Sequence, residues 1–169
     1  MQTEFIGKNS LNNIKKIISD LDAKKILLVT GKGSYNKSGS EEKLIECLGD
    51  AIIERFFDFE ANPNIKDVQV GISIISSFKP DLVIAIGGGS VIDIAKLINI
   101  FAAHVIKEKE IYEFVNKSES VNKPGLPLVA IPTTSGTGSE ATHFAVVYIG
   151  NKKYSFAHKY VLPDFSIID

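Results

Sequence analysis

Three clusters of glycines and residues with small polar side chains, mostly hydroxyls, follow short apolar runs in this chain. They are Gly31-Lys32-Gly33-Ser34, Gly87-Gly88-Gly89-Ser90 and residues 133–139 (TTSGTGS). Glycine lets the backbone approach a ligand with no Cβ in the way, and hydroxyl groups donate hydrogen bonds to phosphate or ribose. A fold that brings the clusters together would therefore create a site for a phosphate-bearing ligand.

The cluster at 87–90 is the most informative, because a helical pattern begins at Ser90. The free N–H groups and the positive dipole end of such a helix favour a diphosphate. A tight strand-to-helix turn is the alternative. Ile92 stands where GxGxxG would place its third glycine, so a standard Rossmann fingerprint is disfavoured. Asp93 fits either a complement to the helix dipole or a ligand contact.

The other two clusters carry alternatives of their own. The stretch 132–140 contains five hydroxyl side chains and two glycines, which favours contacts with phosphate and ribose. A solvated loop with an N-cap is the alternative. Residues 31–38 (GKGSYNKS) match the GxxxxGK[ST] phosphate loop except that Asn36 replaces the second glycine. A phosphate loop needs that glycine for its backbone nest, so a phosphate-loop NTPase is disfavoured.

Composition excludes several classes of protein. The 169 residues are 44% hydrophobic and 23% charged, with a formal net charge of −1, which suits one ordinary domain and argues against disorder or nucleic-acid binding. The single cysteine, Cys47, excludes an internal disulfide and a cysteine-based zinc site, and we expect it in the core. No apolar run is long enough to span a bilayer, and the N-terminus has no secretory pattern, so we expect a cytoplasmic protein with no membrane contact.

Histidines give no metal-binding pattern. His104, His143 and His158 lack HxxxH or HExxH spacing, so we expect them at the surface or at helix ends.

Short apolar runs alternate with helical periodicity along the chain. Helices are expected at 11–21, 41–49, 68–80 and 90–101, and strands at 26–29, 52–59, 82–86, 128–131 and 165–168. Gly150-Asn151 predicts a hairpin between 145–149 and 154–157. The N-caps of the first helix are expected at Asn9 and Ser10. The second helix is expected to carry an apolar stripe of Leu44, Ile45 and Leu48. Residues 115–125 are expected to form a polar surface connection.

This order of elements predicts an α/β fold. It would have an open, mostly parallel sheet with flanking helices, a hairpin near the C-terminus, and one domain over residues 1–169. Ligands of such sheets bind beyond the carboxyl ends of the strands. All three clusters are therefore expected along one edge.

Four segments together resemble the iron-containing, or group III, alcohol dehydrogenase family. They are 81–96 (DLVIAIGGGSVIDIAK), 127–142 (PLVAIPTTSGTGSEAT), 152–154 (KKY) and 162–169 (LPDFSIID). The GGGSxxDxAK pattern is shared loosely with dehydroquinate synthase and glycerol dehydrogenase relatives, whereas PTTxGTGSE narrows the resemblance to the alcohol dehydrogenases.

The resemblance implies an N-terminal domain like that of dehydroquinate synthase, which binds NAD(P) and acts with a helical domain. In the family the helical domain holds Fe²⁺ or Zn²⁺ through one Asp and three His, and the resemblance here covers only the first domain. The chain alone is therefore expected to bind NADP or NAD without turning over a small alcohol or aldehyde, and a homodimer is possible. A non-catalytic nucleotide-binding or docking module, split or remnant, is the alternative.

The resemblance also implies roles for individual residues. The diphosphate loop would be Gly87, Gly88, Gly89 and Ser90, with Asp93 close to the cofactor. The hydroxyl loop that lines the cofactor cleft would include Thr133, Thr134 and Thr137, and Phe144 and Val146 would form the wall of the cleft. Asn62 matches a family asparagine before proline near the cofactor, and Lys153 matches a lysine near the nicotinamide ribose.

One departure bears on cofactor choice. Many NAD-preferring members have Asp where this chain has Gly31. An Asp there bonds the adenosine ribose and repels a 2′-phosphate. Gly31 removes that repulsion, and Lys32, Ser34 and Lys37 add donors and positive charge nearby. We therefore expect NADP(H) to be preferred over NAD(H).

Overall fold

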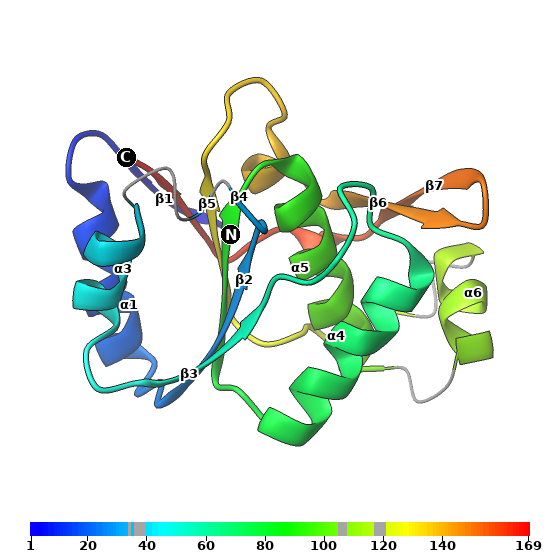
Figure 1. Ribbon diagram of the computed structural model, residues 1–169, viewed down its shortest axis with the longest axis horizontal. Helices are drawn as coiled ribbons and strands as arrows, with labels where there is room; N and C mark the ends of the chain where they lie inside the picture. The colour runs from blue at the N-terminus through cyan, green and yellow to red at the C-terminus, as the bar shows by residue number, and fades with distance from the viewer. Residues whose placement is uncertain (34, 36–39, 105–107, 117–120) are drawn as a thin grey trace.

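A six-stranded sheet dominates the computed structural model, which describes residues 1–33, 35, 40–104, 108–116 and 121–169 (Figure 1). Every neighbouring pair of its strands is parallel, in the order β1-β8-β5-β4-β2-β3. The strands are β1 (Thr3–Ile6), β2 (Lys25–Thr30), β3 (Ile52–Phe56), β4 (Leu82–Gly87), β5 (Leu128–Pro132) and β8 (Phe165–Ile168). An antiparallel hairpin of β6 (Phe144–Ile149) and β7 (Lys152–Ala157) is separate from this sheet. The expected fold class is confirmed.

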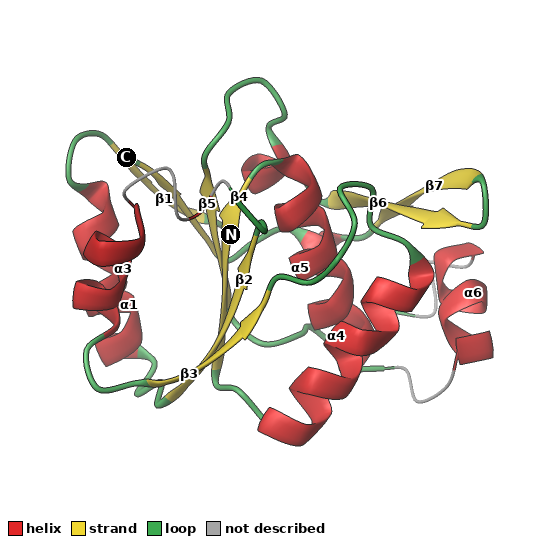
Figure 2. Cartoon of the chain, in the orientation of Figure 1, coloured by secondary structure: helices red, strands yellow, loops and turns green. Residues whose placement is uncertain are grey.

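Helices cover both faces of the sheet (Figure 2). α1 (Asn13–Asp20) and α3 (Ser40–Leu48) lie on one face, and α4 (Ile65–Phe78) and α5 (Gly89–Ala102) lie on the other. α6 (Glu108–Asn116) lies beside the hairpin, and the short 3₁₀ helices are η1 (Ser10–Asn12), η3 (Ser139–Ala141) and η4 (Lys159–Val161). This two-sided cover explains why the central strands read as continuous apolar runs.

The central strands are buried on both sides. Ile26 and Leu28 pack in the core beneath α1 and α3, whereas Leu27 and Val29 pack in the core beneath α5, and all four are less than 4% exposed. Edge strand β3 differs, because Ile52 is 59% exposed. The expected strand at 52–59 is also shorter than predicted, since it ends at Phe56.

The predicted N-caps at the first helix are wrong. Asn9 has a left-handed backbone (φ 66°) and makes no side-chain cap. Instead, the carboxylate of Asp169 accepts hydrogen bonds from the N–H groups of Asn9 (2.8 Å) and Leu11 (3.1 Å). The Ser10 hydroxyl is buried without a hydrogen-bond partner among the described residues. A carboxylate more than 150 positions away therefore does what the local sequence was expected to do.

Three further sequence expectations need correction. Ile45 is 54% exposed and does not share the buried stripe of Leu44 and Leu48. The expected connection at 115–125 begins inside α6, which includes Val115, and residues 117–120 lie outside the described residues. Neither β1 nor α6 was predicted.

Two other expectations concern single features of the described chain. Cys47 is buried, as predicted. Within the described ranges, no helix combines the length and apolarity needed to cross a membrane.

Candidate functional site

The candidate site lies where β2, β4 and β5 end side by side. In the sheet, Thr30 pairs with Ile86 and Gly87 pairs with Pro132. Gly31 and the segments that begin at Gly88 and Thr133 therefore leave neighbouring strands at one edge, as predicted. β2 leads to α3 on one face and β4 leads to α5 on the other (Figure 1). Doubly wound sheets bind ligands where the chain changes face in this way, the switch point of the sheet.

The N-terminus of α5 is open at this edge. Its N-cap residue is Gly88, which has no side chain with which to cap the helix. α4 shows the contrast, because the Asn64 side chain accepts hydrogen bonds from the N–H groups of Lys66 and Asp67 at its first turn. The N–H groups of Val91 and Ile92 donate to the Gly88 carbonyl (3.0 and 3.2 Å). An anion at this end would therefore meet the N–H groups of Gly89 and Ser90.

The hydroxyl loop at 133–139 packs directly against the glycine loop. A Cβ built on Gly88 would lie 3.3 Å from the Thr134 hydroxyl, and one on Gly89 would lie 3.2 Å from Cβ of Thr137 and from the Ser139 hydroxyl. Thr134 and Thr137 are themselves exposed, whereas Ser139 is buried. The two loops are therefore in close contact, and a side chain at either glycine would require these neighbouring side chains to shift.

A buried lysine fastens α5 to the strand that follows the hydroxyl loop. Nζ of Lys96 donates to the carbonyl of Thr142 (2.8 Å), the hydroxyl of Thr142 (3.2 Å) and the carbonyl of Phe144 (3.0 Å). One turn earlier, the carboxylate of Asp93 accepts from the N–H of Val146 (3.1 Å). We call Asp93 and Lys96 the α5 clamp. The clamp fixes the backbone that carries Phe144 and Val146, two residues predicted to line the cofactor cleft.

The sequence-based site did not include Lys96. Its three ammonium donors meet three acceptors, and the residue is 1% exposed. A signal existed, because Lys96 is the only basic residue in α5, three positions after Asp93 in an otherwise apolar stretch. Such a charge in a buried helix needs partners.

The remaining predicted residues lie near the same hairpin. The carbonyl of Pro63, next to Asn62, accepts from the N–H of Tyr148 (2.8 Å), which ties this segment to β6. Lys153 pairs with Tyr148 across the hairpin, and its charge acts on the Asp93 carboxylate. Asn62 and Lys153 are exposed. The fold thus gathers these residues, while their contacts with a cofactor stay a prediction.

Burial shifts the pKa values of both clamp residues. It raises the pKa of Asp93, against the opposing effects of the Val146 N–H, the Lys96 ammonium and the Ser139 hydroxyl. It lowers the pKa of Lys96 from 10.5 to about 8, although the carboxylates of Asp93 and Glu140 favour the charged form. Desolvation penalises the charged form of each group.

The wild-type chain should gain stability relative to a Lys96→Met variant as pH rises from about 8 to 10.5. In the unfolded chain Lys96 keeps its proton up to its ordinary pKa of 10.5, whereas in the folded chain it releases the proton at a lower pH, near 8. The unfolded state therefore binds more protons in this window, and the free energy of unfolding increases with pH, by up to roughly 3 kcal/mol. Urea denaturation of both proteins across the window measures this. A pH-independent difference would show that the folded ammonium keeps its proton.

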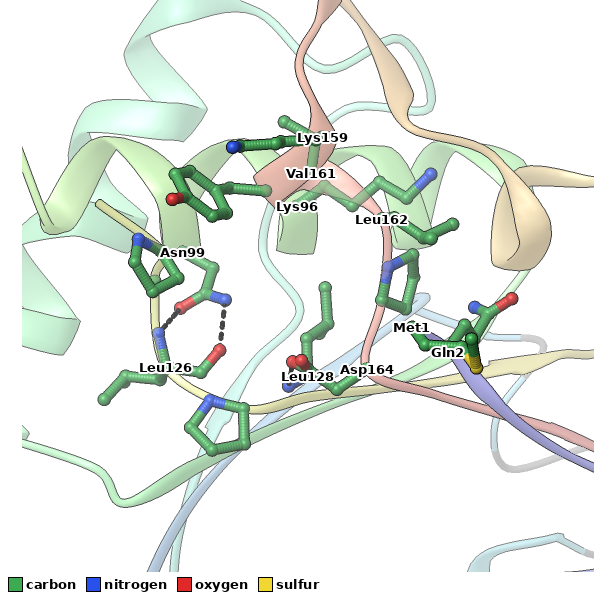
Figure 3. Close-up of a pocket in the computed structure, with 15 residues that line it drawn as sticks. Met1, Gln2, Lys96, Asn99, Leu126, Leu128, Lys159, Val161, Leu162 and Asp164 are labelled. Atoms are coloured by element: carbon green, nitrogen blue, oxygen red, sulfur yellow. Dashed lines mark hydrogen bonds between the residues drawn. The ribbon is translucent and has the colours of Figure 1, made fainter. Parts of the chain in front are cut away.

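Among the cavities of the described residues, two lie at opposite ends of the parallel strands. One of about 590 Å³ lies at the carboxyl edge and includes Thr133 and Thr134 in its lining. The other, of about 600 Å³, lies where β5 begins and is shown in Figure 3. In that cavity the Asn99 amide both donates to and accepts from the backbone of Leu126, and Asp164 accepts from Leu128 N–H. These polar groups are already engaged, so the carboxyl edge remains the candidate site.

The described residues do not offer a metal site. No group of three or more His, Cys, Asp or Glu side chains that could hold a metal ion occurs among them. His104 instead contacts backbone, with Nδ1 2.9 Å from the Ile100 carbonyl and Nε2 accepting from Asn122 and Lys123 N–H (3.2 Å each). We assign no metal chemistry to these residues.

A doubly wound parallel sheet with a glycine loop at its switch point defines a nucleotide-binding domain. The sequence profile of iron-containing alcohol dehydrogenases matches residues 2–169. The chain belongs to the iron-containing alcohol dehydrogenase family, a family of oxidoreductases, and corresponds to its nucleotide-binding domain. The family predicted from the sequence motifs is confirmed.

Individual relatives agree in sequence and structure. The chain is 36% identical over 170 residues to the NADPH-dependent butanol dehydrogenase of Clostridium saccharobutylicum, covering 98% of this chain and 42% of that protein. The crystal structure of 1,3-propanediol oxidoreductase superposes with a TM-score of 0.87 at 30% identity, covering 99% of this chain and 44% of that one. The crystal structure of sulfoacetaldehyde reductase from Bifidobacterium kashiwanohense in complex with NAD⁺ superposes with a TM-score of 0.89 at 29% identity. That superposition covers 99% of this chain and 44% of the reductase. The chain spans less than half the length of these relatives.

Proposed function

We propose that residues 1–169 form a single dinucleotide-binding domain that serves an NAD(P)-dependent alcohol dehydrogenase or aldehyde reductase. The observation that carries this proposal is the N-terminus of α5, which begins at glycines and packs against the hydroxyl loop at the switch point. Family membership supports it, because relatives with this domain are named as NADPH-dependent or were crystallised with NAD⁺.

In this proposal each segment has a separate task. The backbone of Gly88 and Gly89 receives the diphosphate, and Thr134 and Thr137 present hydroxyls beside it. Phe144 and the β6 backbone form a wall held by the α5 clamp. The dinucleotide supplies the hydride chemistry when bound, whereas these residues bind it, orient it and exclude water from one side.

Turnover of a small alcohol or aldehyde needs more than these residues. The described part of the chain holds no cluster of metal-binding side chains, so we expect the 169-residue chain to bind dinucleotide without catalysing alcohol oxidation. A reducing, cytoplasmic location is part of the proposal, because the single cysteine is buried and unpaired. Homodimer formation also remains a proposal.

Parallel fluorescence titrations of the chain with NADPH and NADH test the function. Saturable binding with NADPH tighter would support both the domain assignment and the proposed preference for NADP(H). Tighter NADH binding would retain the domain assignment and overturn the preference. Binding of neither dinucleotide would overturn the proposed function and favour the docking-module alternative, for which co-purification of a second polypeptide is the next measurement.

Replacing Gly31 with Asp should shift preference toward NADH. Gly31 directly follows Thr30, the last residue of β2, so a carboxylate there would meet the adenosine ribose and repel a 2′-phosphate. We expect the ratio of the NADPH and NADH dissociation constants to change by about tenfold or more. Titration of the variant with both dinucleotides measures this ratio. An unchanged ratio would show that the end of β2 does not meet the ribose.

A further inference from the structure

Arg55 lies beside the end of β2 and is the only arginine among the 169 residues. Its side chain extends from β3, and Nε donates to the Thr30 hydroxyl at 2.8 Å. Thr30 is the last residue of β2, and Gly31 follows it. The guanidinium group is therefore fixed next to the strand exit at which doubly wound sheets meet the adenosine ribose.

Two aromatic rings hold the guanidinium. Its Cζ lies 4.6 Å from the ring centroid of Tyr35 and 4.8 Å from that of Phe57. Tyr35 is 2% exposed, so one of the two rings is itself anchored in the core. Stacking on aromatic rings orients the planar guanidinium and directs binding to its N–H edge. Of its five N–H donors, the bond to Thr30 uses only one.

Arg55 forms no ion pair within 4 Å in the part of the chain that the structure describes. Lys32, the other described cation at this strand exit, differs, because its ammonium lies 2.9 Å from the carboxylate of Asp58. The Lys32 charge counted in the sequence analysis thus has an exposed carboxylate partner. Ser34 and Lys37, which were counted with it, lie outside the described residues. Of the two described cations at this exit, Arg55 is the one without an ion pair.

We propose that Arg55 binds the 2′-phosphate of NADP(H) and so determines cofactor specificity. This inference rests on the proposed dinucleotide-binding function and adds the residue that recognises the phosphomonoester. A guanidinium fork matches the oxygens of a phosphate in a two-bond geometry that a lysine cannot supply. In this chain, which otherwise uses lysine at every basic position, the one arginine lies where that geometry is needed.

The test compares Arg55→Gln and Arg55→Lys with the unmodified chain. NADPH and NADH are titrated by fluorescence, and 2′,5′-ADP and 5′-ADP serve as competitors that differ by the 2′-phosphate. Arg55→Gln should raise the dissociation constants of NADPH and 2′,5′-ADP by roughly 10- to 100-fold. It should change the dissociation constants of NADH and 5′-ADP by less than about threefold. Arg55→Lys should lie between, because it keeps the charge and loses the fork.

A matched control removes a positive charge from the other end of β2, the strand that pairs with the strand of Arg55. Lys24→Gln lies just before β2, where the lysine side chain is 76% exposed. It should leave both dissociation constants unchanged, while thermal unfolding checks that every variant is folded.

The outcomes separate the two proposals. Equal losses of NADPH and NADH affinity in folded Arg55→Gln would assign Arg55 a purely structural role in its contacts with Tyr35 and Phe57. Unchanged NADPH binding would place the 2′-phosphate elsewhere. Either result overturns the inference and leaves the dinucleotide-binding function intact. A wild-type chain that binds none of the four ligands overturns the proposed function itself.

Discussion

Replacing Gly89 with valine is expected to weaken the binding of both NADPH and NADH by at least about 100-fold. A Cβ on Gly89 would already meet Thr137 and the Ser139 hydroxyl at 3.2 Å, and the two methyl groups of valine extend further. They would force the hydroxyl loop away from α5 and cover the helix N–H groups that a diphosphate needs. Several charge-assisted hydrogen bonds are lost together, which sets the size of the effect. Fluorescence titration with both dinucleotides measures it.

A stability control distinguishes a blocked site from a loosened fold. A Cβ on Gly71 in α4 would overlap with Cγ2 of Ile98 in α5, a fully buried side chain away from the glycine loop. Gly71→Ala should therefore lower the free energy of unfolding by about 1–3 kcal/mol and leave both dissociation constants nearly unchanged. If Gly89→Val binds NADPH as well as the wild type does, the diphosphate cannot lie on this loop.

The parallel core was predictable because its signals are local. The apolar runs at 26–29, 82–86 and 128–131 need cover on both faces, and only a sheet between two helical layers provides it. Gly150, with a φ of 60°, occupies the tight turn of the hairpin where its sequence placed it. In each case the residues that carry the signal are also those that form the element.

The elements that the sequence did not reveal depend on distant partners. β1 is four residues long and mostly exposed, and it exists because Thr3 pairs with Phe165 at the far end of the chain. The first helix likewise receives its cap from Asp169 rather than from Asn9. Local propensity cannot predict a strand or a cap whose partner lies more than 150 residues away.

The candidate site divides in the same way. Gly88, Gly89 and the threonines of the hydroxyl loop are chemically informative in sequence, because glycine and hydroxyl clusters have few other uses at a strand exit. Arg55 is not, since it stands in a strand without such a cluster. Lys96 gives only the signal of a charge in an otherwise apolar helix, which does not identify its partners. Their contacts with Thr30 and Thr142 arise only when the sheet order and the hairpin are set.

Replacing Lys96 with methionine is expected to lower the free energy of unfolding by about 2–4 kcal/mol. Methionine fills much of the volume but leaves the carbonyls of Thr142 and Phe144 without their donor. It also removes the cation that favours the charged form of the half-buried Asp93 carboxylate. Because the clamp fixes β6, NADPH binding should weaken as well, by roughly tenfold. Urea denaturation and fluorescence titration measure the two effects.

The matched control is Lys66→Met, which removes an exposed lysine from α4 and should change stability by less than about 0.5 kcal/mol. An Asp93→Asn background then tests whether the two clamp residues act together. If they do, Lys96→Met costs less in that background than in the wild type, because the carboxylate that needed the cation is gone. Additive costs would mean that Lys96 stabilises the fold only through its hydrogen bonds to the β6 backbone, independently of the Asp93 charge.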